Sequence, residues 1–233
     1  MDWYSRTEAL LGAGAVERLA AARVVLFGVG GVGSYAAEAL GRAGVGHITL
    51  VDGDAVSESN LNRQLVALHS TIGMDKAEMM RARLLDINPA ADVTALKLFY
   101  TAETAERIDL SAFDYAADAI DMVASKLLLA ERCRAAGTRL ISAMGAGGKL
   151  DPTAFQVCDI SKTSGCPLAR AMRKGLRARG IDKLTVVFSP EEARTTELTE
   201  NGRHVVGSVS FVPSAAGLVM AGKIVRDLAA DPQ

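Results

Sequence analysis

Four closely spaced glycines mark the most informative stretch of the chain, "VVLFGVGGVGSYAAEAL" at residues 24–40. Gly28, Gly30 and Gly33 fit the spacing G-x-G-x-x-G, and Gly31 adds a further glycine. Glycine lets the backbone turn tightly, which brings its N–H groups and the N-terminus of the following helix close to an anion. The spacing predicts a phosphate-binding loop, but it does not distinguish a dinucleotide from ATP.

An acidic residue follows at the distance expected for a ribose contact. Asp52 lies 19 residues after Gly33, at the end of the β-rich run 47–51. A carboxylate in this position accepts hydrogen bonds from ribose hydroxyls. NAD and ATP both carry such hydroxyls, so both nucleotides remain open at this point.

The next segment, "DGDAVSESNLNRQLVALHSTIGMDKAEMM", favours ATP. It places five polar or charged side chains after the ribose carboxylate: Asp54, Asn60, Arg63, Gln64 and Lys76. A dehydrogenase has no need of two further cations here, because the glycine loop already holds its pyrophosphate. A triphosphate carries more charge, and arginine and lysine both bind phosphate and stabilise a leaving pyrophosphate. For Lys76 alone, a solvated start of a helix is an equally good interpretation.

Alternating strands and helices must position these residues, and the sequence pattern predicts them. The β-rich runs 24–27 and 47–51 enclose an Ala- and Leu-rich segment ending at Gly44, which is typical of a βαβ unit. Helices are predicted at 76–87 and 123–136, and strands at 93–98, 115–119 and 139–143. The predicted fold class is α/β, a Rossmann-like mixed, mostly parallel sheet with helices on both faces.

The pattern changes after Gly148. The segments "AFQVCDI", "LTVVFS" and "SVSFV" predict strands that extend the same sheet, partly antiparallel, and an apolar helix follows the last of them. No linker rich in Pro, Gly or Ser separates the halves. We therefore expect one domain over 1–233, with a nucleotide-binding core at 1–145 and a substrate-side extension at 146–233.

The composition is that of an ordinary globular protein, with 49% hydrophobic residues in 233. The formal net charge of −1 gives no general attraction to nucleic acid or membrane, so such binding needs a local patch. The N-terminus lacks the features of a secretory signal, and the uncharged stretch 205–222 carries Pro213, serines and glycines. We expect a cytoplasmic protein without stable membrane insertion.

The three cysteines are too scattered to predict a disulfide framework or a zinc site of the CxxC type. Cys133 falls in a predicted helix and Cys158 in a predicted strand, where both are expected to pack in the core. Cys166, beside Pro167, is the candidate for an exposed thiol.

A local basic face is predicted between Lys162 and Lys183, where basic residues outnumber acidic ones by seven to one. Helical spacing places four cations on one face and apolar residues on another, and the four cations are Arg170, Arg173, Lys174 and Arg177. Mixed charges are usual for a solvated face, so the single sign favours binding of an RNA backbone. A solvated face or a membrane surface are the alternatives.

Four ordered motifs resemble the adenylation core of the ubiquitin-activating-enzyme superfamily, which includes the sulfur-carrier adenylyltransferases of molybdopterin and thiamine synthesis: "GVGGVGS", "VDGDAVSESNLNRQ", "GMDKAE" and "DAIDMVASK". The resemblance implies that Arg63 and Lys76 hold the phosphates, that Asn60 and Gln64 shape the site, and that Asp121 binds Mg²⁺. It also implies a homodimer in which Arg6, in "YSR", reaches the partner subunit's ATP.

The second half resembles the tRNA threonylcarbamoyladenosine dehydratases, through "SAMGAGGKLDPTAFQVCDISKT", "CPLARAMRKGLRARG", "VVFSPE" and "GSVSFVPSAAGLVMAGKIV". This resemblance implies a ligase-class enzyme that uses ATP and Mg²⁺ to cyclise N6-threonylcarbamoyladenosine at position 37 of tRNA through an acyl adenylate. The alternative is adenylation of a ubiquitin-like or sulfur-carrier protein, which would be the partner; the zinc-binding cysteine pairs common in such enzymes are absent. An NAD-dependent dehydrogenase is a third hypothesis.

Overall fold

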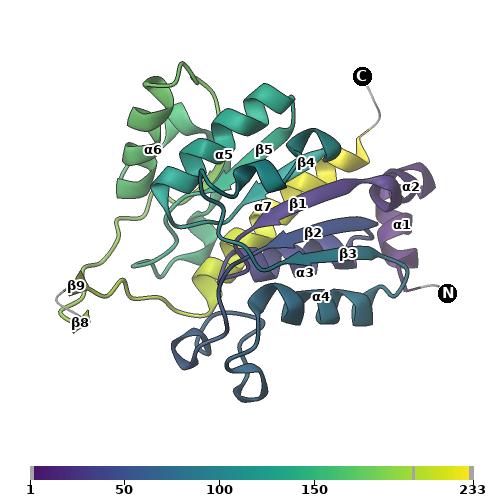
Figure 1. The fold of residues 1–233 in the computed structure, drawn as a ribbon, viewed down its shortest axis with the longest axis horizontal. Helices are drawn as coiled ribbons and strands as arrows, with labels where there is room; N and C mark the ends of the chain where they lie inside the picture. Colours follow the sequence, from purple (N-terminus) through teal and green to yellow (C-terminus); the bar gives the residue numbers. More distant parts are fainter. Residues whose placement is uncertain (1–2, 201–202, 231–233) are drawn as a thin grey trace.

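A seven-stranded sheet forms the centre of the computed structural model, which describes residues 3–200 and 203–230 (Figure 1). Its strands are β1 (Arg23–Phe27), β2 (His47–Val51), β3 (Asp92–Leu96), β4 (Tyr115–Asp118), β5 (Arg139–Ala143), β6 (Gln156–Asp159) and β7 (Thr185–Phe188). They lie in the order β3-β2-β1-β4-β5-β7-β6, and only the β6–β7 pair is antiparallel. The predicted mixed, mostly parallel sheet is confirmed.

Helices cover both faces of this sheet (Figure 1). They are α1 (Ser5–Leu11), α2 (Ala13–Ala21), α3 (Gly33–Arg42), α4 (Lys76–Ile87), α5 (Val123–Ala136), α6 (Pro167–Arg177) and α7 (Phe211–Ala229). Helix α3 packs against α4 and α7, whereas α5 packs against α6. Within residues 3–200 and 203–230, no helix combines the length and the apolar character needed to cross a membrane.

Alternation along β1 explains the two layers. Val24 and Leu26 belong to the core cluster that includes α3, α4 and α7, and Val25 and Phe27 belong to the cluster that includes α5. Successive side chains of a strand point to opposite faces, so a continuous apolar run is buried on both sides. The same rule accounts for the buried runs in β4 and β7.

The predicted elements of the first half are confirmed, with small shifts at their ends. Helices α4 and α5 and strands β2 and β5 have the predicted bounds, and β3 lies one residue earlier at its start and two at its end. Helices α1 and α2 were not predicted. In the second half, β6 and β7 join the sheet formed by the first half, and a short hairpin pairs β8 (Thr199–Glu200) with β9 (Arg203–His204).

The strand predicted from "SVSFV" is wrong. Residues 205–210 form no regular element, and α7 begins at Phe211. Both sides of β7 are already paired, by β5 and β6, so that strand offers this segment no free edge. Pro213 instead lies in the first turn of α7, where its fixed φ and missing N–H are tolerated.

The cysteine predictions need two corrections. Cys133 is buried, and burial raises the pKa of its thiol to about 12. Cys158 is only partly buried rather than packed in the core. Cys166, the candidate for an exposed thiol, is 5% exposed, because it packs in the core cluster that contains Met172 and Phe188. Its Sγ also caps the N-terminus of α6 by accepting a hydrogen bond from Ala169 N–H.

Candidate nucleotide-binding site

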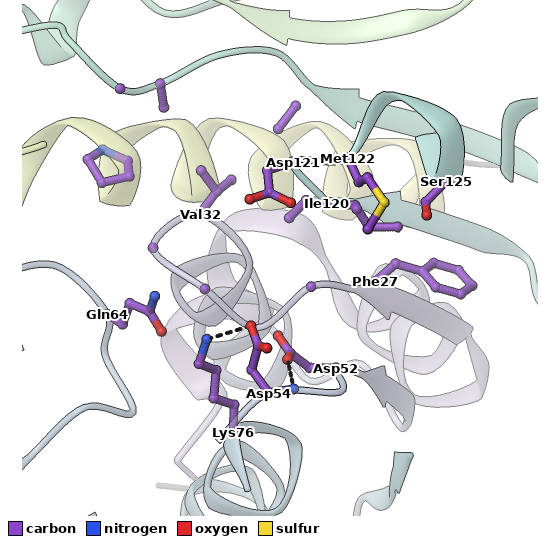
Figure 2. Close-up of a pocket in the computed structure, with 18 of the residues that line it drawn as sticks. Phe27, Val32, Asp52, Asp54, Gln64, Lys76, Ile120, Asp121, Met122 and Ser125 are labelled. Atoms are coloured by element: carbon purple, nitrogen blue, oxygen red, sulfur yellow. Dashed lines mark hydrogen bonds and ion pairs between the residues drawn. The ribbon is translucent and has the colours of Figure 1, made fainter. Parts of the chain in front are cut away.

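A cavity of about 600 Å³ lies at the carboxyl ends of β1, β2, β4 and β5 (Figure 2). In a parallel α/β sheet this edge is where ligands bind. All predicted nucleotide-site residues line the cavity except Gly33, and the full set that does so is Gly28, Gly30, Gly31, Asp52, Asp54, Asn60, Arg63, Gln64, Lys76 and Asp121. The fold therefore brings together residues that are almost 100 positions apart in the sequence.

The glycines have different roles in the loop between β1 and α3. Gly28 has a φ of +87°, and a Cβ there would lie 2.8 Å from the Ala119 carbonyl oxygen. A Cβ on Gly33 would lie 1.7 Å from the Gly28 carbonyl oxygen. At Gly30 the nearest atom, Gln64 Nε2, is 3.7 Å away. Packing therefore requires Gly28 and Gly33, while Gly30 keeps backbone exposed to the cavity.

Asp52 is fixed at the end of β2, beside this loop. Its Oδ2 accepts a hydrogen bond from Val29 N–H at 2.6 Å. Its Oδ1 accepts one from Asp54 N–H at 2.8 Å (Figure 2). Burial raises the pKa of Asp52, although these two N–H groups and Lys76 act in the opposite direction. The carboxylate is thus held in one orientation at the predicted ribose position.

Lys76 forms an ion pair inside the cavity. Its Nζ lies 3.1 Å from Asp54 Oδ2, and Figure 2 shows the two side chains meeting below the glycine loop. Lys76 is the first residue of α4, and its backbone N–H donates to the Asp54 carbonyl. These two contacts join the end of the segment from β2 to α4 back to its beginning, and they set the position of the Lys76 ammonium group.

Arg63 and Gln64 lie on the segment between these two ends. Arg63 Nη1 donates to Ser59 O at 2.8 Å and to Asn62 Oδ1 at 2.9 Å. The side chain of Asn60 is used locally, because its Oδ1 accepts from Ser57 N–H at 3.1 Å. Gln64 is 8% exposed, and its buried Oε1 has no hydrogen-bond partner among the residues that the structure describes. A buried polar atom without a partner is costly, so a polar ligand fits this wall of the cavity.

Carboxylates at the cavity provide oxygen ligands for a cation. Asp121 follows β4, its side chain is exposed to the cavity, and Asp54 lies across from it (Figure 2). Among the described residues, no group of three or more His, Cys, Asp or Glu side chains could hold a metal by itself. One or two carboxylates that share an ion with phosphate oxygens are the usual site for Mg²⁺. The residues present therefore fit Mg²⁺ bound together with a nucleotide.

Several wall residues were not predicted as members of the site. Phe99, Tyr100, Ser125 and the loop 144–147 also line the cavity. Lys126, which ends the motif "DAIDMVASK", lies behind it and is fully buried against Asp118. Its position on the same helix face as Leu129 and Cys133 is the signal that could have marked it, since a lysine amid apolar residues needs a buried counter-ion.

The basic face of α6 lies near the rim, since Leu168 of this helix lines the cavity. Arg170, Lys174 and Arg177 are exposed, while the apolar face of the helix is buried. Arg173 differs, because it is half-buried and donates hydrogen bonds to the carbonyl and hydroxyl oxygens of Thr163. The exposed cationic surface therefore has three of the four predicted members.

Arg6 is exposed on α1 and does not line the cavity. Helix α1 packs against α2, at the end of the sheet where the strands begin (Figure 1). A contact between Arg6 and a nucleotide in this cavity therefore requires a second copy of the chain.

Comparison with known proteins places these features in a family. The model of the ThiF family matches residues 4–232. A tRNA threonylcarbamoyladenosine dehydratase of Bacillus subtilis (strain 168) is 46% identical over 243 residues, which cover 98% of this chain and 95% of that protein.

Solved structures agree in fold over a similar length. The crystal structure of the tRNA N6-threonylcarbamoyladenosine dehydratase TcdA of E. coli with AMP has a TM-score of 0.88 and 36% identity, covering 96% of this chain and 92% of that chain. The complex of the same protein with ATP has a TM-score of 0.86 and 35% identity, covering 97% and 93%. The chain belongs to the ThiF family.

Proposed function

We propose that this chain is an ATP-dependent adenylating enzyme, of the ligase class, that converts N6-threonylcarbamoyladenosine at position 37 of tRNA into its cyclic form. The observation that carries this proposal is the similarity to a named dehydratase over 98% of the chain, including the segment beyond the nucleotide core. The cavity supports this proposal, because its polar and charged residues can bind a nucleoside triphosphate.

ATP binding is assigned to the cavity residues by their chemistry. Asp52 accepts hydrogen bonds from the ribose hydroxyls, and the loop at Gly30 and Gly31 donates backbone N–H groups to phosphate. Arg63 and Lys76 neutralise the outer phosphates, and the Gln64 side chain contacts the same group. Asn60 holds the turn that presents Arg63 and Gln64.

Asp121 is assigned to Mg²⁺. When bound, Mg²⁺ would offset charge on the pyrophosphate as it departs. The protein contributes the Asp121 carboxylate from the connection between β4 and α5, together with the cations Arg63 and Lys76 on the other side of the cavity. These charges are in place before reaction, so little reorganisation is needed during bond breaking.

The reaction joins two steps on one substrate. The threonyl carboxylate attacks the α-phosphorus of ATP, and the bond to pyrophosphate breaks, which gives an acyl adenylate. The carbamoyl group of the same side chain then attacks the acyl carbon and loses a proton, and AMP leaves. The net change in the nucleoside is the loss of water. Ring closure is intramolecular and therefore fast without a protein nucleophile. None of the three cysteines lines the cavity, which fits a route without a thioester.

The exposed cations of α6, Arg170, Lys174 and Arg177, are assigned to the tRNA backbone. They lie on the helix that contributes Leu168 to the cavity rim, so RNA bound there would have its modified nucleotide within reach of ATP. Arg173 supports this surface through its bonds to Thr163. In a homodimer, Arg6 would complete the partner's nucleotide site.

Nucleoside analysis tests the proposal directly. Mass spectrometry of tRNA digested after incubation with enzyme, ATP and Mg²⁺ should show threonylcarbamoyladenosine losing the mass of one water. Omission of ATP is the control, and unchanged nucleoside with ATP present would overturn the dehydratase assignment. Adenylation of a ubiquitin-like or sulfur-carrier protein in place of tRNA would support the alternative, and tighter binding of NAD than of ATP would support a dehydrogenase.

A further inference from the structure

A buried ion pair lies behind the wall of the cavity that carries Asp121. Lys126 Nζ lies 2.9 Å from Asp118 Oδ2, and both side chains are fully buried. Asp118 is the last residue of β4, and Lys126 lies near the start of α5. The pair therefore closes the short connection 119–122 between the strand and the helix.

Both members of the pair also bind the backbone of Ile120, the residue before Asp121. Asp118 Oδ1 accepts a hydrogen bond from Ile120 N–H at 3.0 Å, and Lys126 Nζ donates one to the Ile120 carbonyl at 2.9 Å. Ser142 Oγ on β5 donates to Asp118 Oδ2 at 2.6 Å. The pair thus holds the peptide groups on both sides of the Ile120 Cα: Asp118 binds the peptide before it, and Lys126 binds the peptide that leads into Asp121.

Stability of the fold does not by itself explain this pair. Taking two charges out of water has a large free-energy cost, and apolar side chains of similar size are often as stable or more stable. Lys126 shares its helix face with Leu129, Ala130 and Cys133, all buried, so an apolar residue would suit its position. What an apolar residue could not do is donate to the Ile120 carbonyl.

We propose that Asp118 and Lys126 are positioning residues that hold the Asp121 carboxylate in the orientation needed for Mg²⁺ with ATP. The role of Asp121 itself rests on the proposed function. Ile120, Asp121 and Met122 line the cavity, and Figure 2 shows the Asp121 carboxylate directed toward the side that holds Lys76. A rotation of the peptide group between Ile120 and Asp121 would turn this carboxylate away from the Lys76 side of the cavity.

The informative variant removes both charges together. Lys126→Met alone leaves a buried carboxylate without its counter-ion, which is expected to prevent folding. In the double variant D118N/K126M, the amide still accepts the Ile120 N–H bond, and the flexible thioether fills the space of the lysine stem. This variant should unfold at a temperature close to that of the parent, but it lacks the donor to the Ile120 carbonyl.

Calorimetric titration with ATP, with and without Mg²⁺, separates positioning from folding. We expect D118N/K126M to lose about 10- to 100-fold in ATP affinity when Mg²⁺ is present, the usual loss when a group supporting a metal ligand is removed. Affinity without Mg²⁺ should be unchanged. Asp121→Ala should show the same loss, and the three substitutions together should cause no further loss, because the pair acts through Asp121. The control K223M/D227N removes the ion pair between Lys223 and Asp227 of α7, together with the pair that Asp227 forms with Arg139, and should bind as the parent does.

Amide hydrogen exchange provides a readout independent of nucleotide. The Asp121 N–H group belongs to the peptide whose carbonyl loses its donor in D118N/K126M, so it should exchange faster in this variant than in the parent. The inference is overturned if the double variant keeps the parent's affinity with Mg²⁺, or if it loses affinity equally with and without Mg²⁺. A parent that does not bind ATP would instead overturn the proposed function, and unchanged exchange of the Asp121 N–H would then separately exclude the positioning role.

Discussion

The ammonium group of Lys76 lies 3.1 Å from the Asp54 carboxylate, and the lysine side chain is 7% exposed while that of the aspartate is 55% exposed. The cation is therefore fixed in the wall of the cavity, whereas its partner can turn toward solvent. A triphosphate entering the cavity can replace Asp54 as the partner of Lys76 without moving the lysine. In the proposed reaction, the Lys76 ammonium group would supply a preorganised positive charge next to the leaving pyrophosphate.

Lys76→Ala and Arg63→Ala should slow formation of the acyl adenylate more than they weaken ATP binding. Each should lower the single-turnover rate by roughly 10²–10³-fold, as observed when a preorganised donor to a transition state is removed. Lys97→Ala is the matched control, because Lys97 pairs with Asp75 on the surface next to the same helix. Equal losses in rate and in ATP affinity would show that the two cations act only in binding.

Asp52→Ala should weaken ATP binding by about 1.5–3 kcal/mol, the usual contribution of hydrogen bonds to a charged acceptor. The loss should disappear when 2′,3′-dideoxy-ATP is titrated, because that analogue lacks the hydroxyls that Asp52 is expected to bind. Calorimetry of both ligands with both proteins forms the complete test. A variant that still discriminates between the two ligands would remove Asp52 from the ribose site.

The raised pKa of Asp52 predicts the pH dependence of nucleotide binding. The ionised carboxylate accepts the ribose hydroxyls, so its contribution is complete above the raised pKa and is lost as pH falls through it. Affinity should therefore begin to fall at a higher pH than for an ordinary aspartate. The Asp52→Asn variant has no carboxyl group to titrate and should lack this step. A step of the same size in parent and variant would assign it to another group.

Reversal of charge on α6 tests the proposed RNA surface. The variant K174E/R177E should bind tRNA more weakly and with a flatter salt dependence, because fewer counter-ions are released on association. ATP affinity should be unchanged. The control R107E/R226E makes the same change of net charge at exposed residues of other elements and should leave tRNA binding much closer to that of the parent. Equal effects of the two variants on tRNA binding would show that net charge, and not the α6 surface, determines the affinity.

Two glycine substitutions separate packing from ligand approach. Gly33→Ala places a Cβ 1.7 Å from a carbonyl oxygen, so we expect the free energy of unfolding to fall by about 1–3 kcal/mol or more. Gly30→Ala meets only Gln64 Nε2 at 3.7 Å, so its stability should be close to that of the parent while its ATP affinity falls. Thermal unfolding and calorimetry measure the two effects. Normal ATP binding by Gly30→Ala would show that the phosphates do not bind against this loop.

The cysteines should be unreactive in the folded protein. Burial raises the pKa of Cys133 to about 12 and also raises the pKa of Cys158, so little thiolate forms at neutral pH. Iodoacetamide should modify Cys133 only after denaturation, and Cys158 slowly. Mass spectrometry of the alkylated protein reports each site. Replacement of all three cysteines by alanine should leave cyclisation intact, provided that the variant folds; an inactive folded variant would restore a role for a thiol.

Much of the nucleotide core was predictable because its signals are local. The glycine spacing, Asp52 at the end of β2, and the helices α4 and α5 are fixed by short-range sequence patterns. Strand alternation then implies a parallel sheet, and the carboxyl ends of its strands must share one edge. The sequence therefore determined which residues could meet there, including Arg63 and Lys76, which now line one cavity.

Only the tertiary structure decided which partners the remaining residues have. Three features depend on neighbours that the fold brings together: the hydrogen bond between Ser142 and Asp118, the burial of Cys166, and the hydrogen bonds from Arg173 to Thr163. The segment "SVSFV" has the period of a strand, yet β7 offers it no free edge and α7 begins within it. The periodicity of a sequence shows which face of an element is apolar. The free energy of a buried charge or of a strand pairing depends instead on the residues that face it. Contacts between distant parts of the chain determine those residues.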